Sequence, residues 1–139
     1  MKIFLDTNVL LDCLLDRYPF ADDAEEVIEI CTASGNNGAF STLSACNMIY
    51  IMSKAVGQSD AETLVQNIVE LTGLVAIEPG DVTINLCGGH PDFEDAVQIV
   101  AAQRWGADII VTRDKKGFVD SPVKVLTPAE FLRAQEGTV

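Results

Sequence analysis

Three aspartates occupy positions at which an α/β protein gathers ligand-binding side chains. Asp6 directly follows the apolar run 2–5, Asp114 follows the β-branched run 108–112, and Asp95 lies near the start of a helical pattern. Because the carboxyl ends of parallel strands lie at one edge of a sheet, these carboxylates can converge there. Carboxylates at short range raise one another's pKa, and a hard cation with oxygen ligands relieves the repulsion. The spacing therefore predicts a site for Mg²⁺ or Mn²⁺.

Each of these acids also has a simpler interpretation. Asp6 could cap the helix that follows it, and Asp114 could be a turn residue. Asp95 could stabilise the positive end of a helix dipole, a role that suits its neighbours Asp92 and Glu94 better. Singly, each signal is weak. Together, three aspartates at the productive ends of separate elements favour a functional site.

Alternating strand and helix patterns indicate the fold that must position these acids. Short apolar runs bounded by turn residues predict strands at 2–5, 39–41, 74–77, 108–112 and 123–126. Helical spacing of apolar residues predicts helices at about 9–14, 21–32, 43–56, 60–71, 81–87, 91–105 and from 128 onward. This order predicts a three-layer α/β/α sandwich with a mainly parallel sheet of four or five strands, and residues 1–139 as a single domain.

Capping residues predict where three of these helices begin. Thr42 or Ser44 is expected to cap the helix after the second strand. Pro91 is expected in the first turn of the helix that carries Asp95. The sequence Thr127-Pro-Ala-Glu130 is a capping box for the last helix.

Composition limits the class of function. The chain has 139 residues, of which 48% are apolar, and this suffices for one hydrophobic core. A net charge of −12 argues against sequence-blind coating of DNA or RNA, although a local patch could still bind a phosphate backbone. The candidate cations, each equally explained as a solvated surface residue, are Lys54, Arg104, Arg113, Lys115 and Lys116. The acidic surface also suits a basic protein partner.

Cellular location follows from two further features of the sequence. No apolar stretch is long enough to cross a membrane, and the chain enters strand-like sequence after one lysine, so we expect a cytoplasmic protein. The four cysteines, in helical or apolar segments, show no CxxC spacing. We therefore expect buried, reduced thiols rather than a zinc site or disulfides.

Several blocks of the chain resemble, in order, those of the PIN domain family. They are Phe4-Leu-Asp-Thr-Asn-Val-Leu10, Ser41-Thr-Leu-Ser44 with Asn47-Met-Ile-Tyr-Ile-Met52, Asp92-Phe-Glu-Asp-Ala-Val-Gln98 and Ile110-Val-Thr-Arg-Asp114. The blocks span nearly the whole chain and are closest to a bacterial subgroup with Asp-x-Glu-Asp-Ala followed by Thr-Arg-Asn or Thr-Arg-Asp. The resemblance implies a metal-dependent endoribonuclease, often the toxin of a type II toxin–antitoxin pair. It also implies a homodimer neutralised by a small DNA-binding antitoxin.

The same resemblance assigns roles to individual residues. Asp6, Asp95 and Asp114 match the metal-coordinating acids of the family, and they are the expected catalytic residues. Thr7 and Asn8 match the polar residues that support the first aspartate. The resemblance thus implies Mg²⁺ or Mn²⁺ as the cofactor and RNA as the substrate.

Two positions depart from the family pattern. Many PIN nucleases carry a glutamate on the helix after the second strand, where this chain has Asn47. Its amide can hold a water but carries no charge, so we expect weaker metal affinity. Gly117 stands where the subgroup often has an aspartate before Phe118. We count Asn47 and Asp92 as supporting residues of a depleted site.

Two functions from different classes remain. The first is a Mg²⁺- or Mn²⁺-dependent ribonuclease in which Arg113, Lys115 or Lys116 contacts RNA. The second is a catalytically weakened PIN-like module that binds RNA or a protein partner. The uncharged Asn47 favours the second, whereas the three retained aspartates favour the first, which we prefer. A phosphotransfer receiver fits less well, because it would need a phosphorylatable aspartate on a middle strand and a late lysine.

Overall fold

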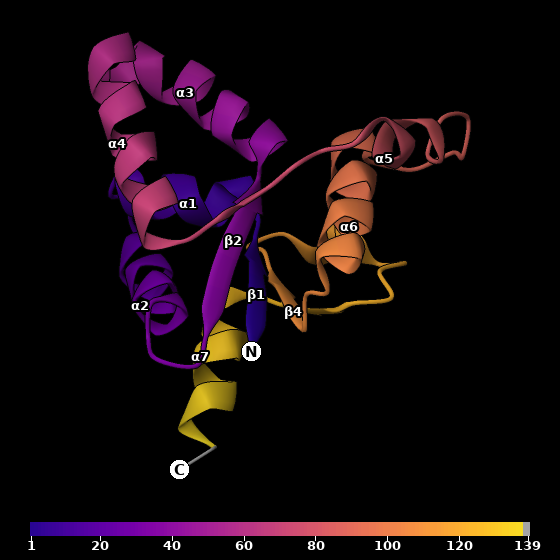
Figure 1. Cartoon of the computed structure of the whole chain (residues 1–139). Coiled ribbons are helices and arrows are strands. Elements are labelled where there is room, and N and C mark those ends of the chain that lie inside the picture. Colours follow the sequence, from indigo (N-terminus) through magenta and orange to yellow (C-terminus); the bar gives the residue numbers. More distant parts are fainter. Residues whose placement is uncertain (138–139) are drawn as a thin grey trace.

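A five-stranded parallel sheet lies at the centre of the molecule (Figure 1). The computed structural model describes residues 1–137, and within them the strand order is β3-β2-β1-β4-β5. The strands are β1 Lys2–Leu5, β2 Asn37–Ser41, β3 Leu74–Val75, β4 Ile109–Val111 and β5 Lys124–Leu126. The strand order reverses beside β1, and open α/β sheets bind ligands at the carboxyl ends of the strands at such a point.

Helices cover both faces of this sheet, as the sequence predicts (Figure 1). They are α1 Thr7–Leu14, α2 Ala21–Cys31, α3 Thr42–Val56, α4 Gln58–Leu71, α5 Pro79–Thr83, α6 Phe93–Trp105 and α7 Pro128–Glu136, with a short 3₁₀ helix η1 Lys115–Phe118. One core cluster joins the sheet to α1, α2, α3, α4 and α7, and a second joins the opposite face to α6 and η1. The α/β/α layering is therefore confirmed.

The last three residues of the central strand β1 are fully buried, and they cover both faces of the sheet. Ile3 and Leu5 belong to the first core cluster, whereas Phe4 belongs to the second, and each side chain is 0% exposed. Successive side chains of a strand point to opposite faces, so three consecutive apolar residues are needed where helices cover both. This burial fixes the position of everything that follows Leu5 directly.

The residues that follow β1, β2 and β4 meet at the carboxyl edge of the sheet. Leu5 is paired in register with Val111, and the N–H of Asp6 donates to the Val111 carbonyl at 3.0 Å. Thr112 continues β4 through an N–H bond of 3.0 Å to the Leu126 carbonyl. Ser41 ends β2 at the same edge. Side chains distant in sequence are thereby brought together.

The second and third strands differ from the predicted ranges. β2 begins at Asn37, two residues earlier than expected, because the N–H of Asn37 donates to the Met1 carbonyl and extends the pairing with β1. β3 spans Leu74–Val75 rather than 74–77. Its chain leaves the sheet at Ile77, whose N–H donates to the Thr42 hydroxyl at 3.1 Å instead of to a neighbouring strand.

The predicted starts of two helices are wrong, by one or three residues for the cap of α3 and by two residues for α6. Ser41, rather than Thr42 or Ser44, caps α3, because its backbone is extended and its Oγ accepts the N–H of Ser44 at 3.0 Å. Pro91 lies before α6 rather than in its first turn. The extended residue Asp92 caps that helix instead, and an extended cap requires the helix to begin after it.

The capping box at α7 is confirmed. Thr127 Oγ1 accepts the N–H of Glu130, and Glu130 Oε1 accepts the N–H of Thr127. These reciprocal bonds satisfy two backbone donors and hold the start of α7 beside the end of β5.

The cysteines are only partly where we expect them. All four are free thiols, and Cys31 is buried, which raises the pKa of its thiol to about 12. Cys13 is partly buried, but Cys46 and Cys87 are exposed. The expectation of buried thiols is wrong for these two, because Cys46 lies on the outer side of α3 and Cys87 lies in the loop after α5. Among residues 1–137, no helix is long and apolar enough to span a membrane.

An ion pair between the buried Asp12 and the partly exposed Arg113 links α1 to the segment after β4. Asp12 is 1% exposed, and its carboxylate accepts the Nε–H of Arg113 at 2.7 Å and an Nη2–H at 3.2 Å. The Arg113 guanidinium also lies over the Phe20 ring, 4.2 Å from its centroid. Arg17 lies farther away, 3.7 Å from the same carboxylate, so the hydrogen bonds of Asp12 depend on the chain after β4 staying in place against α1.

Replacing Asp12 with alanine should therefore destabilise the fold. The change leaves the partly exposed Arg113 guanidinium without its carboxylate, and we expect a loss of about 2–3 kcal/mol in the free energy of unfolding. Urea denaturation followed by circular dichroism measures it. Glu26→Ala removes an exposed acid from α2 and should stay within about 0.5 kcal/mol of wild type. Equal stability of the two variants would contradict the structural role of Asp12.

Candidate active site

Asp6 is held at the carboxyl edge by groups from two elements. Its side chain is only 8% exposed. Oδ1 accepts the N–H of Thr7 at 2.8 Å, which makes Asp6 the cap of α1, and Oδ2 accepts the hydroxyl of Thr112 at 2.7 Å. The capping role and the position at the sheet edge therefore coexist. Both oxygens are oriented by donors that belong to the fold itself.

The first turn of α6 brings further acids toward Asp6. Asp95 is half-buried there, and its N–H donates to Oδ1 of the capping residue Asp92 at 2.9 Å. Glu94, which the sequence assigns to the helix dipole, also accepts a hydrogen bond of 2.7 Å from the amide of Asn47. Helix α3 therefore presents an uncharged amide at this position, and α6 supplies a carboxylate that binds it.

Asp114 approaches the site from the segment after β4. It is exposed and caps η1, with Oδ1 accepting the N–H of Lys116 at 3.1 Å, so the turn role considered for it is real. Gly117 of the same turn lies against Asp95, and a Cβ at this glycine would be 2.7 Å from Asp95 Cγ. The missing aspartate at position 117 thus has a physical reason, since no side chain fits there while Asp95 keeps its place.

The pKa values reveal that these carboxylates share one electrostatic environment. Burial raises the pKa of Asp6 and outweighs the two hydrogen bonds that lower it. For Asp95, burial and the nearby negative charges raise the pKa to about 7. The charges acting on Asp95 belong to Asp6, Asp92, Glu94 and Asp114. At neutral pH the edge therefore carries negative charge that the protein does not compensate.

The donor chemistry suits a hydrated divalent cation. Among residues 1–137, no three His, Cys, Asp or Glu side chains are grouped closely enough to enclose a metal ion. Mg²⁺ commonly keeps several waters and takes only one or two carboxylates directly, so a complete protein cage is not required. Asp6, Asp95 and Asp114 offer hard oxygen donors, and their repulsion is what such an ion would relieve. The residues present fit a partly hydrated Mg²⁺ or Mn²⁺.

A cluster of buried hydroxyl and amide groups lies behind Asp6. Ser44 Oγ is within hydrogen-bond distance of Thr7 Oγ1 at 2.7 Å and Ser41 Oγ at 3.3 Å, and it accepts from Gln98 Nε2 at 2.9 Å. Ser41, Ser44 and Gln98 are each 0% exposed. The cluster thus joins β2, α3 and α6 to the first residue of α1.

Asn8 and Thr112 brace the other side of Asp6. The side-chain Oδ1 of Asn8 accepts the N–H of Arg113 at 3.2 Å, and its Nδ2 donates to Thr112 Oγ1 at 3.5 Å. Thr112 Oγ1 also accepts the N–H of Asp114 at 3.3 Å while it donates to Asp6. Asn8 therefore acts on Asp6 through Thr112 rather than by direct contact.

The cations considered for RNA binding differ in how far the protein already neutralises them. Arg113 pairs with Asp12, and Lys115 pairs with Glu130 at 2.9 Å. No ion pair to Lys116 is present among residues 1–137. Arg104 of α6 binds Asp81 of α5, and the Lys54 ammonium lies 4.2 Å from the Tyr50 ring centroid.

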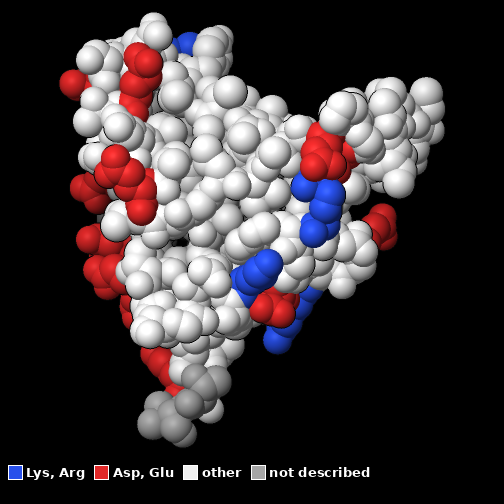
Figure 2. Space-filling view, viewed as in Figure 1, with Lys and Arg blue, Asp and Glu red and all other residues white. Residues whose placement is uncertain are grey.

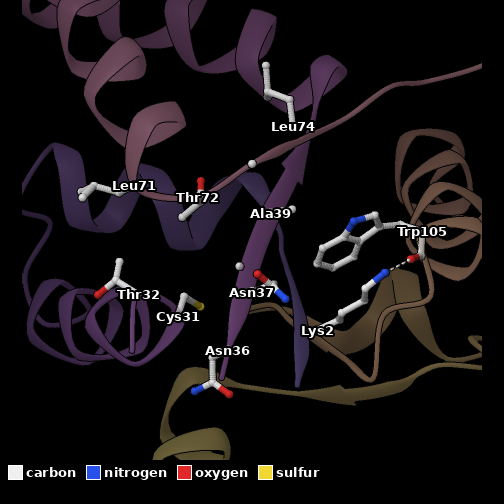
Figure 3. Close-up of a pocket in the computed structure, with 12 residues that line it drawn as sticks. Lys2, Cys31, Thr32, Asn36, Asn37, Ala39, Leu71, Thr72, Leu74 and Trp105 are labelled. Atoms are coloured by element: carbon white, nitrogen blue, oxygen red, sulfur yellow. Dashed lines mark hydrogen bonds between the residues drawn. The ribbon is translucent and has the colours of Figure 1, made fainter. Parts of the chain in front are cut away.

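A pocket of about 330 Å³ lies at the opposite edge of the sheet (Figure 3). Lys2, Asn37 and Trp105 line it, and the Lys2 ammonium donates to the Trp105 carbonyl at 2.9 Å. None of the predicted site residues contributes to it. The pocket is therefore separate from the acidic edge.

Comparison with known families agrees with this geometry. A PIN domain family model matches residues 2–116, which include Asp6, Asp95 and Asp114. The chain belongs to the PIN domain family. The predicted resemblance is thus confirmed over most of the sequence.

Individual relatives of this PIN domain include a ribonuclease, and its fold neighbours include a toxin. It is 27% identical over 138 residues to Ribonuclease VapC1 of Aquifex aeolicus, an alignment that covers 94% of this chain and 92% of the relative. Its fold is similar to VapBC2 of Rickettsia felis bound to a promoter DNA fragment, with a TM-score of 0.71, 18% identity and coverage of 91% and 98% of the two chains. It is also similar to the sarcin-ricin loop cleaving toxin VapC20 of Mycobacterium tuberculosis, with a TM-score of 0.66, 10% identity and coverage of 84% and 92%.

Several residues around the PIN site are not evident from the sequence pattern. Thr112 is read only as the end of a strand, although its hydroxyl binds Asp6. Gln98 lies three residues after Asp95 on the buried side of α6, among residues expected to be apolar packing. A polar residue on a buried helix stripe is a signal that could have identified it. Nothing in the sequence indicates that Glu94 contacts Asn47.

Asp95→Asn should alter the pH dependence of stability. Asp95 has a pKa of about 7 in the folded PIN domain and about 4 when unfolded. The stability that depends on protonated Asp95 is thus fully present below about pH 4, and it is lost as the pH rises through 7. We expect the variant to melt above the metal-free wild type at pH 8 and close to it at pH 4, as differential scanning fluorimetry can measure. An equal difference at both pH values would contradict this assignment.

Gly117→Ala should displace the Asp95 carboxylate. The added methyl group would meet the Asp95 side chain, so we expect Mn²⁺ affinity, measured by calorimetry, to fall about tenfold or more. Gly80→Ala is the matched control, because a Cβ at Gly80 meets nothing within 4 Å. Unchanged Mn²⁺ affinity in Gly117→Ala would show that the contact with Asp95 does not matter for metal binding.

Proposed function

We propose that this PIN domain is a Mg²⁺- or Mn²⁺-dependent endoribonuclease and the toxin of a type II toxin–antitoxin pair. The observation that carries the proposal is the convergence of Asp6, Asp95 and Asp114 at the carboxyl edge, where burial and then the neighbouring carboxylates raise the pKa of Asp95 to about 7. Family membership and the similarity to Ribonuclease VapC1 of Aquifex aeolicus support it. We place the reaction in the cytoplasm and treat residues 1–139 as one domain.

The residues that would hold the ion are Asp6, Asp95 and Asp114. When bound, Mg²⁺ or Mn²⁺ supplies an acidified water and positive charge at the phosphate. Thr7 and Thr112 keep the Asp6 carboxylate oriented through their hydrogen bonds. Burial of Asp6 excludes bulk water from that side of the site, which strengthens its electrostatic interactions.

Glu94 lies beside Asn47, the position on α3 where many PIN nucleases carry an acid. It contributes to the raised pKa of both Asp6 and Asp95. Glu94 therefore places a negative charge beside the uncharged Asn47. We infer that the site keeps enough charge for metal binding, and this favours the nuclease over the weakened binding module.

The catalytically weakened binding module remains the second candidate, because two cations near the site are already paired with carboxylates. Arg113 and Lys115 are already paired with Asp12 and Glu130, so they attract phosphate less than free side chains would. An active nuclease must therefore rely on the metal and on uncharged donors to hold RNA. Lys116 remains the nearest candidate for a direct phosphate contact.

A small basic antitoxin is the protein partner that we propose. Figure 2 shows acidic side chains gathered on the side of the molecule that α2 and α4 form. Those of α2 are Asp22, Asp23, Glu25, Glu26 and Glu29. Leu71 of α4, which is exposed and lines a pocket together with Glu25 and Glu29, suits further contacts. Among the fold relatives, VapBC2 of Rickettsia felis was solved bound to promoter DNA. We further propose that the chain forms a homodimer.

Cleavage of a mixed-sequence RNA tests the enzymatic proposal. Purified wild type should cut it with Mn²⁺ or Mg²⁺ and stop on addition of EDTA. The double variant Asp6→Asn/Asp95→Asn should lose at least about a hundredfold in rate, because it removes two charged oxygen ligands.

The control for this experiment is Asp108→Asn, which changes a carboxylate at the opposite edge of the sheet, where it accepts the N–H of Lys2. Its cleavage rate should match that of wild type. Absent cutting by the wild type, with RNA binding retained, would favour the binding module instead.

A further inference from the structure

In the hydroxyl cluster behind Asp6, the donor and the acceptor of each hydrogen bond are fixed by the neighbouring groups. Ser44 Oγ has three neighbours within hydrogen-bond distance, namely Thr7 Oγ1, Ser41 Oγ and Gln98 Nε2. A hydroxyl group has one proton to donate and two lone pairs with which to accept. Three neighbours therefore use its full capacity, and each contact must be either a donation or an acceptance.

Two of the three contacts are acceptances by Ser44. The Gln98 amide nitrogen can only donate, and it does so at 2.9 Å. The Ser41 hydroxyl also donates to Ser44 Oγ at 3.3 Å, while Ser41 Oγ accepts the backbone N–H of Ser44. Both lone pairs of Ser44 are thus occupied. Its own proton must go to Thr7 Oγ1, which lies 2.7 Å away.

The orientation of the Gln98 amide decides this direction. As oriented, Gln98 Oε1 is the buried side-chain atom that lacks a hydrogen-bond partner within residues 1–137. The reversed amide would instead bury its NH₂ group, with two protons, where Oε1 now lies. Orphaned buried donors are rarer in proteins than under-satisfied carbonyls, so the orientation that donates to Ser44 is the more stable one.

The proton of Thr7 is then available to a ligand. Threonines within helices commonly donate to the carbonyl four residues earlier, but Thr7 begins α1 and the residues before it form β1. Within the described chain, no hydrogen bond other than that with Ser44 involves Thr7 Oγ1. Thr7 is partly exposed and directly follows Asp6. Thr112 differs, because its proton is used on Asp6.

We propose that the Thr7 hydroxyl donates a hydrogen bond to a non-bridging phosphate oxygen of RNA, and that Ser44 and Gln98 are positioning residues that free its proton. The inference rests on the proposed ribonuclease function. An uncharged donor suits this edge, where Arg113 and Lys115 are already neutralised and the carboxylates repel phosphate. A fixed donor aimed at a phosphate oxygen stabilises the charge that develops there during cleavage.

Substitutions at Thr7 test the contact with phosphate. Thr7→Val keeps the shape and removes the hydroxyl, so kcat for RNA cleavage with Mn²⁺ should fall about tenfold to a hundredfold. Thr7→Ser restores the hydroxyl and should stay within about threefold of wild type. Mn²⁺ affinity should be unchanged in both, because Thr7 holds no metal. Thr63→Val removes an exposed hydroxyl on α4 and serves as the control.

A double-mutant cycle tests the positioning role of Gln98. Gln98→Met fills the same buried space without a donor, which leaves a lone pair of Ser44 free to accept the Thr7 proton. We expect a loss in kcat of about tenfold in the wild-type background and less than twofold in the Thr7→Val background. A loss of equal factor in both backgrounds would overturn the proposal, since Gln98 would then act independently of Thr7.

Nuclear magnetic resonance can show, without catalysis, whether the Ser44 hydroxyl donates its proton to Thr7. The buried Ser44 hydroxyl proton should exchange slowly and give a nuclear Overhauser effect to the Thr7 methyl group in labelled wild-type protein. A Ser44 proton that contacts Gln98 instead would overturn the inference.

If wild type cuts RNA but Thr7→Val cuts equally well, this inference fails alone. If wild type does not cut RNA, the proposed function fails and takes this inference with it.

Discussion

Burial of Asp6 at the end of the central strand is the constraint on which the rest of the site depends. A buried carboxylate is costly unless hydrogen bonds satisfy it, and here the donors are the N–H of Thr7 and the hydroxyl of Thr112. Thr7 must therefore begin a helix, and β4 must lie beside β1 so that Thr112 reaches Asp6. The fold on both sides of β1 is tied to one side chain.

The acids around Asp6 are better explained by chemistry than by stability. Asp92 has a structural role as the cap of α6, but Asp95 gains negative neighbours and a pKa near 7 from its place. Gly117 leaves room for the Asp95 carboxylate because glycine has no side chain. Carboxylates that repel one another in this way are typical of functional sites. A cation bound among them replaces that repulsion by attraction to the ion. Membership in the PIN domain family agrees with this interpretation.

The sequence predicts those parts of the molecule that depend on local pattern. Apolar runs identify β1 and β4, and the Thr127 capping box identifies α7, because neighbouring residues determine each. Asp6 and Asp114 are predicted at one edge because strand ends must meet there. The contact between Glu94 and Asn47 joins residues 47 positions apart, and only the packing of α6 against α3 creates it. Ser41 could not be chosen over Thr42 as the cap, since both are hydroxyl residues at the same strand end.

The pairing of the cations changes how an acidic nuclease must hold RNA. With a net charge of −12, long-range attraction of a polyanion is absent, and Asp12 and Glu130 already neutralise two cations beside Asp114. Affinity must then come from a bound metal ion and from uncharged donors fixed by the fold. Uncharged donors carry no long-range penalty of their own and keep their strength at high salt, because screening acts on charges rather than on short hydrogen bonds. The direction in which they donate must be set by buried partners, and this explains why the fully buried Gln98 lies behind the partly exposed Thr7.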